Sequence, residues 1–460
     1  MKEILIQNAE AVVTCDGQDR VIRNCDIRIS GNKIVQIGQG LKNTGSESPV
    51  CEVIDARGCF VYPGLVNTHH HFFQTFVRSL PEIDYPNLTV MEWIARIYPI
   101  FSRMTADGIY YSSMAAFVDL VKHGCTCAFD HQYCFTPGTG KEAVDRQMKA
   151  AKEIGIRYHA GRGANTLSKA EGSSIPDEMV ETTEEFLEDC DRLIAKYHDP
   201  NPFSMSQIVI APCQPINCQK ETFTESVKMA RSRGVRMHTH LGEGEAQGMY
   251  ERYGRRTLEW CEEIGFAGED VWYAHCWELT DEEYKRLGKL GSGISHCPAP
   301  AVLGGFPILD LPKLKEYGVA VSLGCDGSST NDSSSMLDTL RMAYLMQAYH
   351  SKERGYRCPS PYEMLKIATV SGAQMLGRSD LGTLEEGKAA DLFMIEAEKL
   401  EFAGAVHDPA ALLARTGATG PVKMTMINGE TVWKDGHLMQ VNEENLFRDA
   451  MQCFREISII

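Results

Sequence analysis

The sequence predicts an α/β protein in which a (β/α)8 TIM-type barrel is joined to a small β-sandwich domain built from both ends of the chain. Short apolar segments alternate with amphipathic helical stretches through residues 61–379, which is the rhythm of repeated strand-helix units. Short strands broken by turns occupy both ends of the chain. The length of 460 residues accommodates one barrel-sized domain and a smaller companion.

The β-sandwich domain is assigned to residues 1–60 and 380–440. The first part contains stretches in which apolar and polar residues alternate, with a turn at Ser30-Gly31-Asn32 between two of them. The second part contains DLFMIEA and VKMTMINGETVWKDG, in which Asn428-Gly429 is a strong hairpin signal. Residues 441–460 are expected to form a C-terminal helical segment.

The barrel is assigned to residues 61–379 and requires eight strands. If these strands are parallel and each is followed by a helix, their C-terminal ends gather on one face, where barrel enzymes carry their active sites. Most of the candidate strands end in a histidine or an acid, so this face is where we expect chemistry. In chain order the eight endings are GLVNTHHH, TCAFDH, IRYHAGRG, IVIAPCQ, VRMHTHLGE, VWYAHCW, SGISHCP and VAVSLGCDG.

Charge and composition limit the classes of partner. A net charge of −16 disfavours nucleic acids and anionic membranes, because both are bound by clustered Lys and Arg. We therefore expect a small-molecule substrate. The N-terminal MKEILIQNAEAVV lacks the apolar block of a signal peptide, and the sixteen cysteines are scattered without a CxxC pair. Both features favour a cytoplasmic protein with reduced thiols.

The clearest local motif is Asn67-Thr68-His69-His70-His71, which directly follows an apolar strand. Side chains alternate along a strand, so His69 and His71 share one face and His70 points to the other. Two neutral imidazoles at a strand end are natural ligands for zinc and related metals. A histidine-rich loop without function is the alternative.

The fifth strand ends in His238-Thr239-His240-Leu241-Gly242-Glu243. His240 lies nearest the barrel mouth and is a candidate third imidazole ligand, while Glu243 is a candidate proton shuttle. His238 has the same parity but lies deeper, so we interpret it as a supporting or core histidine rather than a ligand.

Two further strand ends complete the set. His275 ends the sixth strand and Asp326 the eighth. An aspartate there can bind a metal through one oxygen and accept a proton from water through the other. Alone, His275 would be interpreted as a core histidine and Asp326 as a helix cap. Cys276 and Cys297 stand beside histidines, but neither has a paired cysteine, so buried inert thiols are preferred over metal ligands.

Together these motifs resemble the amidohydrolase superfamily, specifically its cytosine deaminase-like branch with a single metal. PGLVNTHHH is similar to the first-strand HxH motif, HTHLGE to the fifth-strand HxxE, YAHC to the sixth-strand histidine and LGCDG to the eighth-strand aspartate. The resemblance implies one divalent ion, zinc with ferrous iron as the alternative. It assigns the metal to His69, His71, His240 and Asp326, and catalysis to Glu243, His275 and Asp326.

Within this branch the chain is most similar to 8-oxoguanine deaminases and hydroxytriazine aminohydrolases, through HHHFFQTFVR, FDHQYCF, CDGSSTNDSSSML and FAGAVHDPAAL. The resemblance implies that Gln74 recognises a ring carbonyl or ring N–H of the substrate, with a surface glutamine as the alternative. His131, Arg162 and Trp277 also lie at strand ends and are candidate pocket residues. One departure is SHCPAPA at residues 295–301, where many relatives carry HCPxSN.

The resulting hypothesis is hydrolytic deamination of an amino-substituted oxo-heterocycle, with 8-oxoguanine as the first choice. A metal activates water, Asp326 takes its proton, Glu243 protonates a ring nitrogen, and His275 stabilises the developing oxyanion. Hydrolysis of an N-alkylamino hydroxytriazine and deamination of guanine or isocytosine are the alternatives, and a non-catalytic assembly protein is a distant one. A homo-oligomer, as a dimer, is expected without an identifiable interface.

Overall fold

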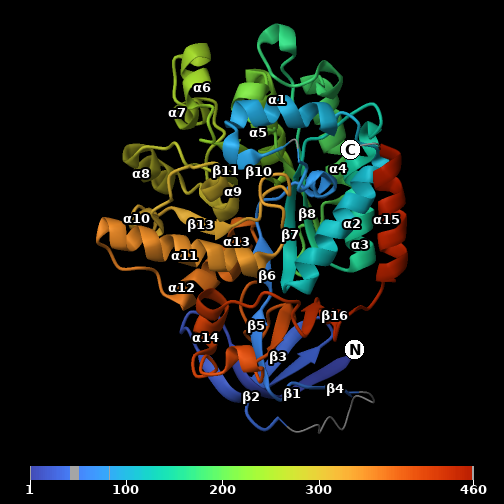
Figure 1. Cartoon of the computed structure of the whole chain (residues 1–460), viewed down its shortest axis with the longest axis vertical. Coiled ribbons are helices and arrows are strands. Elements are labelled where there is room, and N and C mark those ends of the chain that lie inside the picture. The colour runs from blue at the N-terminus through green and yellow to red at the C-terminus, as the bar shows by residue number, and fades with distance from the viewer. Residues whose placement is uncertain (1, 42–50, 82, 458–460) are drawn as a thin grey trace.

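The described part of the protein contains a barrel of parallel strands surrounded by helices and a second sheet beneath it, as the computed structural model shows (Figure 1). The structure describes residues 2–41, 51–81 and 83–457. The barrel occupies the upper part of Figure 1, and the sheet formed by the two ends of the chain lies beneath it. None of the helices within these ranges is both long and apolar enough to span a bilayer.

Among the described residues, one sheet contains eight parallel strands that follow one another in chain order, which confirms the predicted barrel. The Thr68 N–H donates to the Leu323 carbonyl at 3.1 Å and the Asp326 N–H donates to the His69 carbonyl at 3.0 Å, so the last strand closes on the first. The strands are β6 (Leu65–Asn67), β7 (Cys125–Gln132), β8 (Arg157–Arg162), β9 (Ser206–Ile210), β10 (Arg236–Leu241), β11 (Val271–His275), β12 (Gly293–His296) and β13 (Ala320–Leu323).

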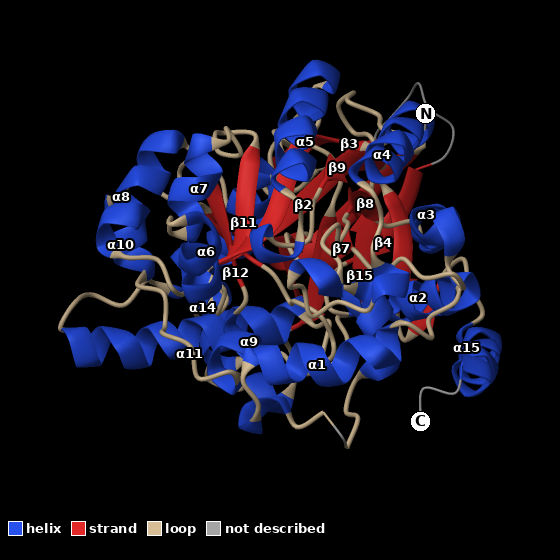
Figure 2. Ribbon diagram, turned by 90° about the horizontal axis from the view of Figure 1, so that it is seen from above, coloured by secondary structure: helices blue, strands red, loops and turns tan. Residues whose placement is uncertain are grey.

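Helices surround the barrel (Figure 2), and their ends follow from local sequence. Thr182 and Thr280 form capping boxes with the glutamates three residues later, and Gly155 and Gly234 end helices in the left-handed conformation. The principal helices are α1 (Val90–Phe101), α2 (Ala106–Lys122), α3 (Ala143–Ile154), α4 (Thr183–Tyr197), α5 (Lys220–Arg233), α6 (Ala246–Tyr253), α7 (Thr257–Glu263), α8 (Asp281–Leu290), α9 (Pro298–Leu303), α10 (Leu311–Glu316), α11 (Met336–Arg354), α12 (Pro361–Lys366) and α15 (Glu443–Ile457).

The two ends of the chain form one composite β domain, as predicted, and its nine strands are linked in a single hydrogen-bonded sheet. The predicted hairpin at Asn428-Gly429 is present, with φ of 55° and 79°, because two left-handed residues suit the twist of antiparallel strands. The strands are β1 (Glu3–Val13), β2 (Val21–Ser30), β3 (Lys33–Gly38), β4 (Cys51–Asp55), β5 (Cys59–Pro63), β14 (Leu392–Glu396), β15 (Met424–Ile427), β16 (Glu430–Lys434) and β17 (His437–Leu438).

The β domain and the barrel are joined by a buried ion pair. Arg157 at the start of β8 donates from Nε to Asp391 Oδ2 at 2.7 Å and from Nη2 to Oδ1 at 3.1 Å, and the Arg157 side chain is fully buried. Its remaining donors reach the carbonyls of Phe203 and Ser204 and the side chain of Asn428. A bidentate pair with all donors satisfied can offset the cost of burying two charges.

Substituting Arg157→Met should lower the free energy of unfolding by about 3–5 kcal/mol, because it leaves the Asp391 carboxylate buried without a partner. Urea denaturation followed by circular dichroism measures this loss. The double variant Arg157→Met, Asp391→Asn should recover part of the stability, since it removes the unpaired charge. If the double variant lost as much free energy of unfolding as Arg157→Met and Asp391→Asn lose together, the ion-pair argument would be contradicted.

Candidate metal centre

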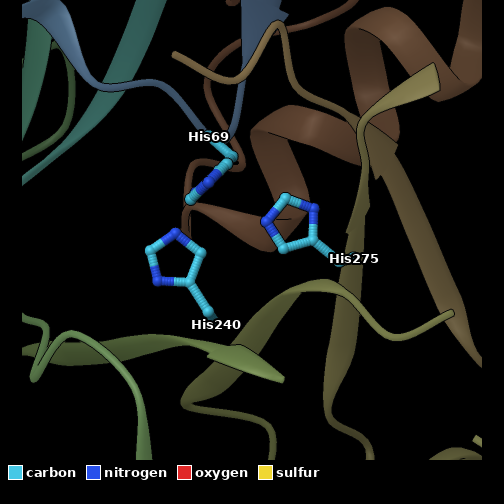
Figure 3. Close-up of side chains that lie close together, drawn as sticks. All are labelled: His69, His240 and His275. Atoms are coloured by element: carbon cyan, nitrogen blue, oxygen red, sulfur yellow. The ribbon is translucent and has the colours of Figure 1, made fainter. Parts of the chain in front are cut away.

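The C-terminal ends of the barrel strands bring the predicted histidines and acids together. His69 follows β6, His240 lies in β10 and His275 ends β11, and Figure 3 shows the three rings directed toward one another. One nitrogen of each lies within 4.8 Å of the others, and His69, His71 and Asp326 form a second group of the same kind. His70 points away and hydrogen-bonds Ser334 at 2.8 Å, as strand alternation predicts.

Hydrogen bonds to the backbone fix the tautomers of two of these histidines. His71 Nδ1 lies 2.9 Å from the His131 carbonyl, and His240 Nδ1 lies 2.7 Å from the Cys213 carbonyl. A carbonyl only accepts, so each Nδ1 carries the proton and each Nε2 keeps its lone pair. The two Nε2 atoms are 3.0 Å apart. Two facing lone pairs repel each other. A cation that accepts both lone pairs would remove this repulsion.

His69 is fixed in the same way through His238. His238 Nδ1 donates to the Trp272 carbonyl at 2.9 Å, so its Nε2 accepts from His69 Nδ1, also at 2.9 Å. This leaves the lone pair on His69 Nε2, a buried atom without a hydrogen-bond partner among the described residues. Burial lowers the pKa of His238 well below its usual value, which keeps the relay neutral. His238 therefore orients His69, as histidine ligands require.

Asp326 adds a carboxylate oxygen to the three imidazoles. Its Oδ1 lies 3.2 Å from His69 Nε2 and 3.3 Å from His71 Nε2. A tetrahedral ion with metal-ligand distances of about 2.0–2.1 Å separates neighbouring ligand atoms by about 3.3 Å. The residues therefore fit a divalent ion by both distance and protonation state. The other oxygen, Oδ2, accepts from Thr330 Oγ1 at 3.2 Å.

Substituting His238→Phe tests the relay without removing a ligand. The ring would fill the same buried space beside Trp272, but His69 Nδ1 would lose its acceptor, and the tautomer with a free Nε2 would no longer be favoured. Metal affinity should fall about 10- to 100-fold, as for other partners of histidine ligands. Titration with a fluorescent chelator measures it, and unchanged affinity would show that the relay does not matter.

Glu243 and His275 lie beside the four candidate ligand groups. Glu243 Oε1 is 3.4 Å from His275 Nε2, and the Glu243 side chain is 17% exposed, so it can meet a bound molecule. Burial, followed by the charge of Asp326, raises the pKa of Glu243 well above its usual value. A carboxyl group that holds its proton near neutral pH can act as a general acid. Both ring nitrogens of His275 are buried without a hydrogen-bond partner within the described ranges.

Gln74 has most of its hydrogen-bonding capacity committed. Its Oε1 accepts from Ser329 Oγ at 2.6 Å and from the Ser329 N–H at 3.3 Å, and its Nε2 donates to Tyr133 Oη at 3.1 Å. Only one N–H of the carboxamide is left for another molecule. The carboxamide therefore keeps a free donor but no free acceptor, and its predicted role in substrate recognition stays a prediction.

Two other predicted pocket residues also contact the histidines. The His131 ring stacks on His240 with centroids 4.8 Å apart, and its Nε2 donates to the Ala211 carbonyl at 2.6 Å. The Trp277 ring lies 4.4 Å from His275 and stacks on Phe306 at 4.5 Å. The indole N–H of Trp277 is buried without a partner among the described residues, so it is available as a donor.

Arg162 is placed differently from the other predicted pocket residues. Its Nε donates to Asp189 at 2.7 Å, its Nη2 donates to Glu181 at 2.6 Å, and its guanidinium covers the Phe135 ring at 3.6 Å. In the described part of the chain no hydrogen bond or ion pair joins it to the histidines. The structure therefore assigns the Arg162 side chain to a buried ion-pair network, because two acids of the neighbouring segment occupy its donors.

Sequence reasoning missed Tyr85, which lies in the short helix η2 (Tyr85–Asn87) before α1. Its hydroxyl is buried without a partner within the described ranges, and a side chain on Gly304 would begin 2.8 Å from it. Burial, then the charges of Glu243 and Asp326, raise the pKa of Tyr85, so the hydroxyl lies within electrostatic range of both carboxyl groups. No motif marked this tyrosine, because a short helix between barrel elements, rather than a strand end, carries it.

The barrel and its histidine cluster define a metal-dependent hydrolase of the amidohydrolase class. The model of the amidohydrolase family matches residues 60–432, and the chain belongs to this family. It is 46% identical to a hydroxydechloroatrazine ethylaminohydrolase of Pseudomonas sp. (strain ADP), over 99% of this chain and 96% of that protein. It is 35% identical to an 8-oxoguanine deaminase of Pseudomonas aeruginosa, over 90% of each.

A solved structure shares this architecture. The crystal structure of an atrazine chlorohydrolase from Arthrobacter aurescens TC1 complexed with zinc matches with a TM-score of 0.92 and 30% identity. The match covers 98% of this chain and 100% of that one. The predicted fold is therefore confirmed by its neighbours as well as by its own strands.

Proposed function

We propose that this protein is a zinc-dependent aminohydrolase that removes an amino or alkylamino substituent from an oxo-substituted nitrogen heterocycle, with a hydroxytriazine as the first candidate. The observation that carries the proposal is the convergence of three imidazole lone pairs and one carboxylate oxygen at 3.0–3.3 Å contacts. The hydroxytriazine is placed first because the relative named for that chemistry is 46% identical over almost the whole chain.

His69, His71, His240 and Asp326 would hold one divalent ion. A bound zinc ion supplies a Lewis acid that lowers the pKa of water from 15.7 towards about 7. All four ligand groups are buried, which excludes bulk water and strengthens the electrostatic interactions between them.

The remaining steps are proton transfers by the protein. Asp326 would accept a proton from the attacking water at Oδ2, which already receives a hydrogen bond from Thr330. Glu243 would donate its proton to a ring nitrogen beside the amino-bearing carbon, making that carbon more electrophilic. The C–O bond forms, the C–N bond breaks, and the proton held by Asp326 passes to the leaving nitrogen. As the carbonyl forms, the remaining hydroxyl proton returns to Glu243, so both carboxyl groups regain their starting states. His275 would stabilise the negative charge on the oxygen that the attacking water adds to the ring carbon.

The unpartnered donors near the histidine cluster favour a ring that presents hydrogen-bond acceptors. Gln74 has one free N–H, and the Tyr85 hydroxyl and the Trp277 indole are buried without partners in the described part of the chain. A ligand that leaves these donors without an acceptor binds more weakly, because each donor has lost its contact with water. A ligand with carbonyl or ring-nitrogen acceptors opposite them avoids this cost. The stacked Trp277 and Phe306 rings provide an apolar wall for a planar ring.

8-Oxoguanine is a second candidate, because a deaminase for it is 35% identical to this chain. Steady-state rates on an N-ethylamino hydroxytriazine, 8-oxoguanine, guanine and isocytosine, together with metal analysis, decide between the candidates. We expect one equivalent of zinc and a kcat/KM for the hydroxytriazine at least tenfold above the others. A reversed order would favour 8-oxoguanine, while a metal-free protein inactive on the whole panel would refute the proposal.

The state of the cysteines supports a cytoplasmic location within the same proposal. All fifteen cysteines whose side chains the structure describes are unpaired. Cys276 and Cys297 are buried, and burial raises the pKa of each thiol well above its usual value, as expected for inert thiols. Free thiols in this number suit a reducing compartment.

Substituting Tyr85→Phe should lower kcat/KM for the preferred substrate about tenfold, because one hydrogen bond of roughly 1.4 kcal/mol is lost. The effect should vanish for an analogue that lacks the ring oxygen, which a pairwise comparison of kcat/KM measures. Tyr250→Phe is the matched control, since Tyr250 is 60% exposed. An equal loss on both substrates would indicate a structural role for Tyr85.

A further inference from the structure

The outer face of α11, the helix that follows the last barrel strand, carries an exposed apolar stripe. Met342 is 37% exposed, Leu345 is 50% and Tyr349 is 67%. The opposite face is already used, because Leu337, Leu340, Ala343 and Met346 are buried in the core. Figures 1 and 2 both show α11 running along the outside of the molecule. The stripe is therefore a surface that the chain itself does not cover.

The stripe has the spacing of a helix-pairing seam. Together with Asp338 and Lys352, both exposed, its residues follow one another in steps of four, three, four and three. An average step of 3.5 residues keeps side chains in line along a neighbouring helix, as in coiled coils. Any face of a helix repeats in steps of three and four, and what distinguishes this face is that its exposed apolar residues are flanked by opposite charges at its two ends. The surface therefore fits a second helix that runs alongside α11.

The charges at the ends of the stripe indicate which helix fits. Asp338 lies seven residues before Leu345 and Lys352 seven residues after it. An antiparallel copy of α11 centred on Leu345 would place Asp338 opposite the partner subunit's Lys352, at both ends of the contact. Neither side chain has an ion-pair partner within the described residues of its own chain. A two-fold contact needs this self-complementarity, since both subunits present the same surface.

We propose that the protein forms a homodimer in which α11 packs antiparallel against the α11 of a second copy, with the two-fold axis beside Leu345. The apolar stripe supplies the buried centre of the contact, and the two Asp338–Lys352 pairs set its direction and register. Val302 is 51% exposed on α9, a helix that packs against α11. The active-site residues take no part in this contact.

Sedimentation velocity of the zinc-loaded, full-length protein tests the proposal. We expect a dimer for the wild type and a monomer for Leu345→Glu at the same micromolar concentration, with unchanged circular dichroism. Phe447→Glu is the matched control: Phe447 is 67% exposed on α15, away from this stripe, so the dimer should persist. A monomeric wild type, or a dimer that Leu345→Glu does not weaken, would overturn the proposal.

A charge exchange tests the antiparallel register and avoids any effect of adding a charge to an apolar surface. Asp338→Lys alone places like charges opposite each other at both ends and should raise the dimer Kd about tenfold or more. The double variant Asp338→Lys, Lys352→Asp restores opposite charges in the antiparallel arrangement and should bring the Kd back. A double variant as weak as the single one would exclude this arrangement.

Discussion

Substituting Glu243→Gln should lower kcat by about 10²- to 10⁴-fold while the protein keeps its fold and its metal. Glutamine has the same shape but holds no transferable proton, and the loss of a positioned general acid has this magnitude. Glu243 lies beside His275 rather than among the atoms at 3.0–3.3 Å contacts, so metal content should be unaffected. Steady-state kinetics and metal analysis on one preparation measure both quantities.

The pH dependence provides a second check on the same residue. The pKa of Glu243 is raised, first by burial and then by the charge of Asp326, so its proton is held to higher pH than that of an ordinary glutamate. If Glu243 is the general acid, kcat should fall as the pH rises through that raised pKa. This alkaline decline should be absent in Glu243→Gln. A decline that persists in the variant would belong to another group.

The fold was predictable because its signals are local. Apolar strands and amphipathic helices alternate regularly, so eight barrel strands could be counted from the sequence and all are present. The hairpin at Asn428-Gly429 follows from two residues that tolerate positive φ. The pairing of β5 with β14, which unites both ends of the chain in one sheet, depends on contacts between distant segments. Local patterns predict such strands but not which of them pair.

In the site, too, some residues could be predicted from local sequence patterns and others could not. His69, His71 and His240 were found because strand ends converge and side chains alternate along a strand. The left-handed backbone at His275 and Asp326, with φ of 72° and 65°, could not be predicted, since non-glycine residues rarely adopt it. Such strained backbone is typical of functional sites, and here it directs the last side chains into the cluster.

Individual side-chain directions were the least predictable feature. Arg162 ends a strand as His131 does, yet its guanidinium is held by Glu181 and Asp189 rather than lying among the histidines. Tyr85 lies in the short helix η2, which carries no motif. His238 was expected to support the ligands, and its relay to Trp272 became visible only with the distances between ring nitrogens and carbonyls. Partners of this kind are set by tertiary contacts.

Substituting His240→Ala should abolish metal binding and reduce activity to background, in contrast to Glu243→Gln. Removing His240 Nε2 takes away one of four ligand atoms and the partner that faces His71 Nε2 at 3.0 Å. The remaining groups then lack the tetrahedral set that zinc requires. Metal analysis after dialysis should find less than a tenth of an equivalent, with the fold retained by circular dichroism.

The pair of variants separates binding the metal from transferring the proton. If His240→Ala alone loses the metal, the imidazoles and Asp326 hold the ion and Glu243 acts on the substrate. If both variants lose it equally, Glu243 is itself a ligand and the proton shuttle must be sought elsewhere, with His275 the nearest titratable group. Added zinc should restore activity to neither variant, because His240→Ala lacks a ligand atom and Glu243→Gln lacks the proton that activates the ring nitrogen.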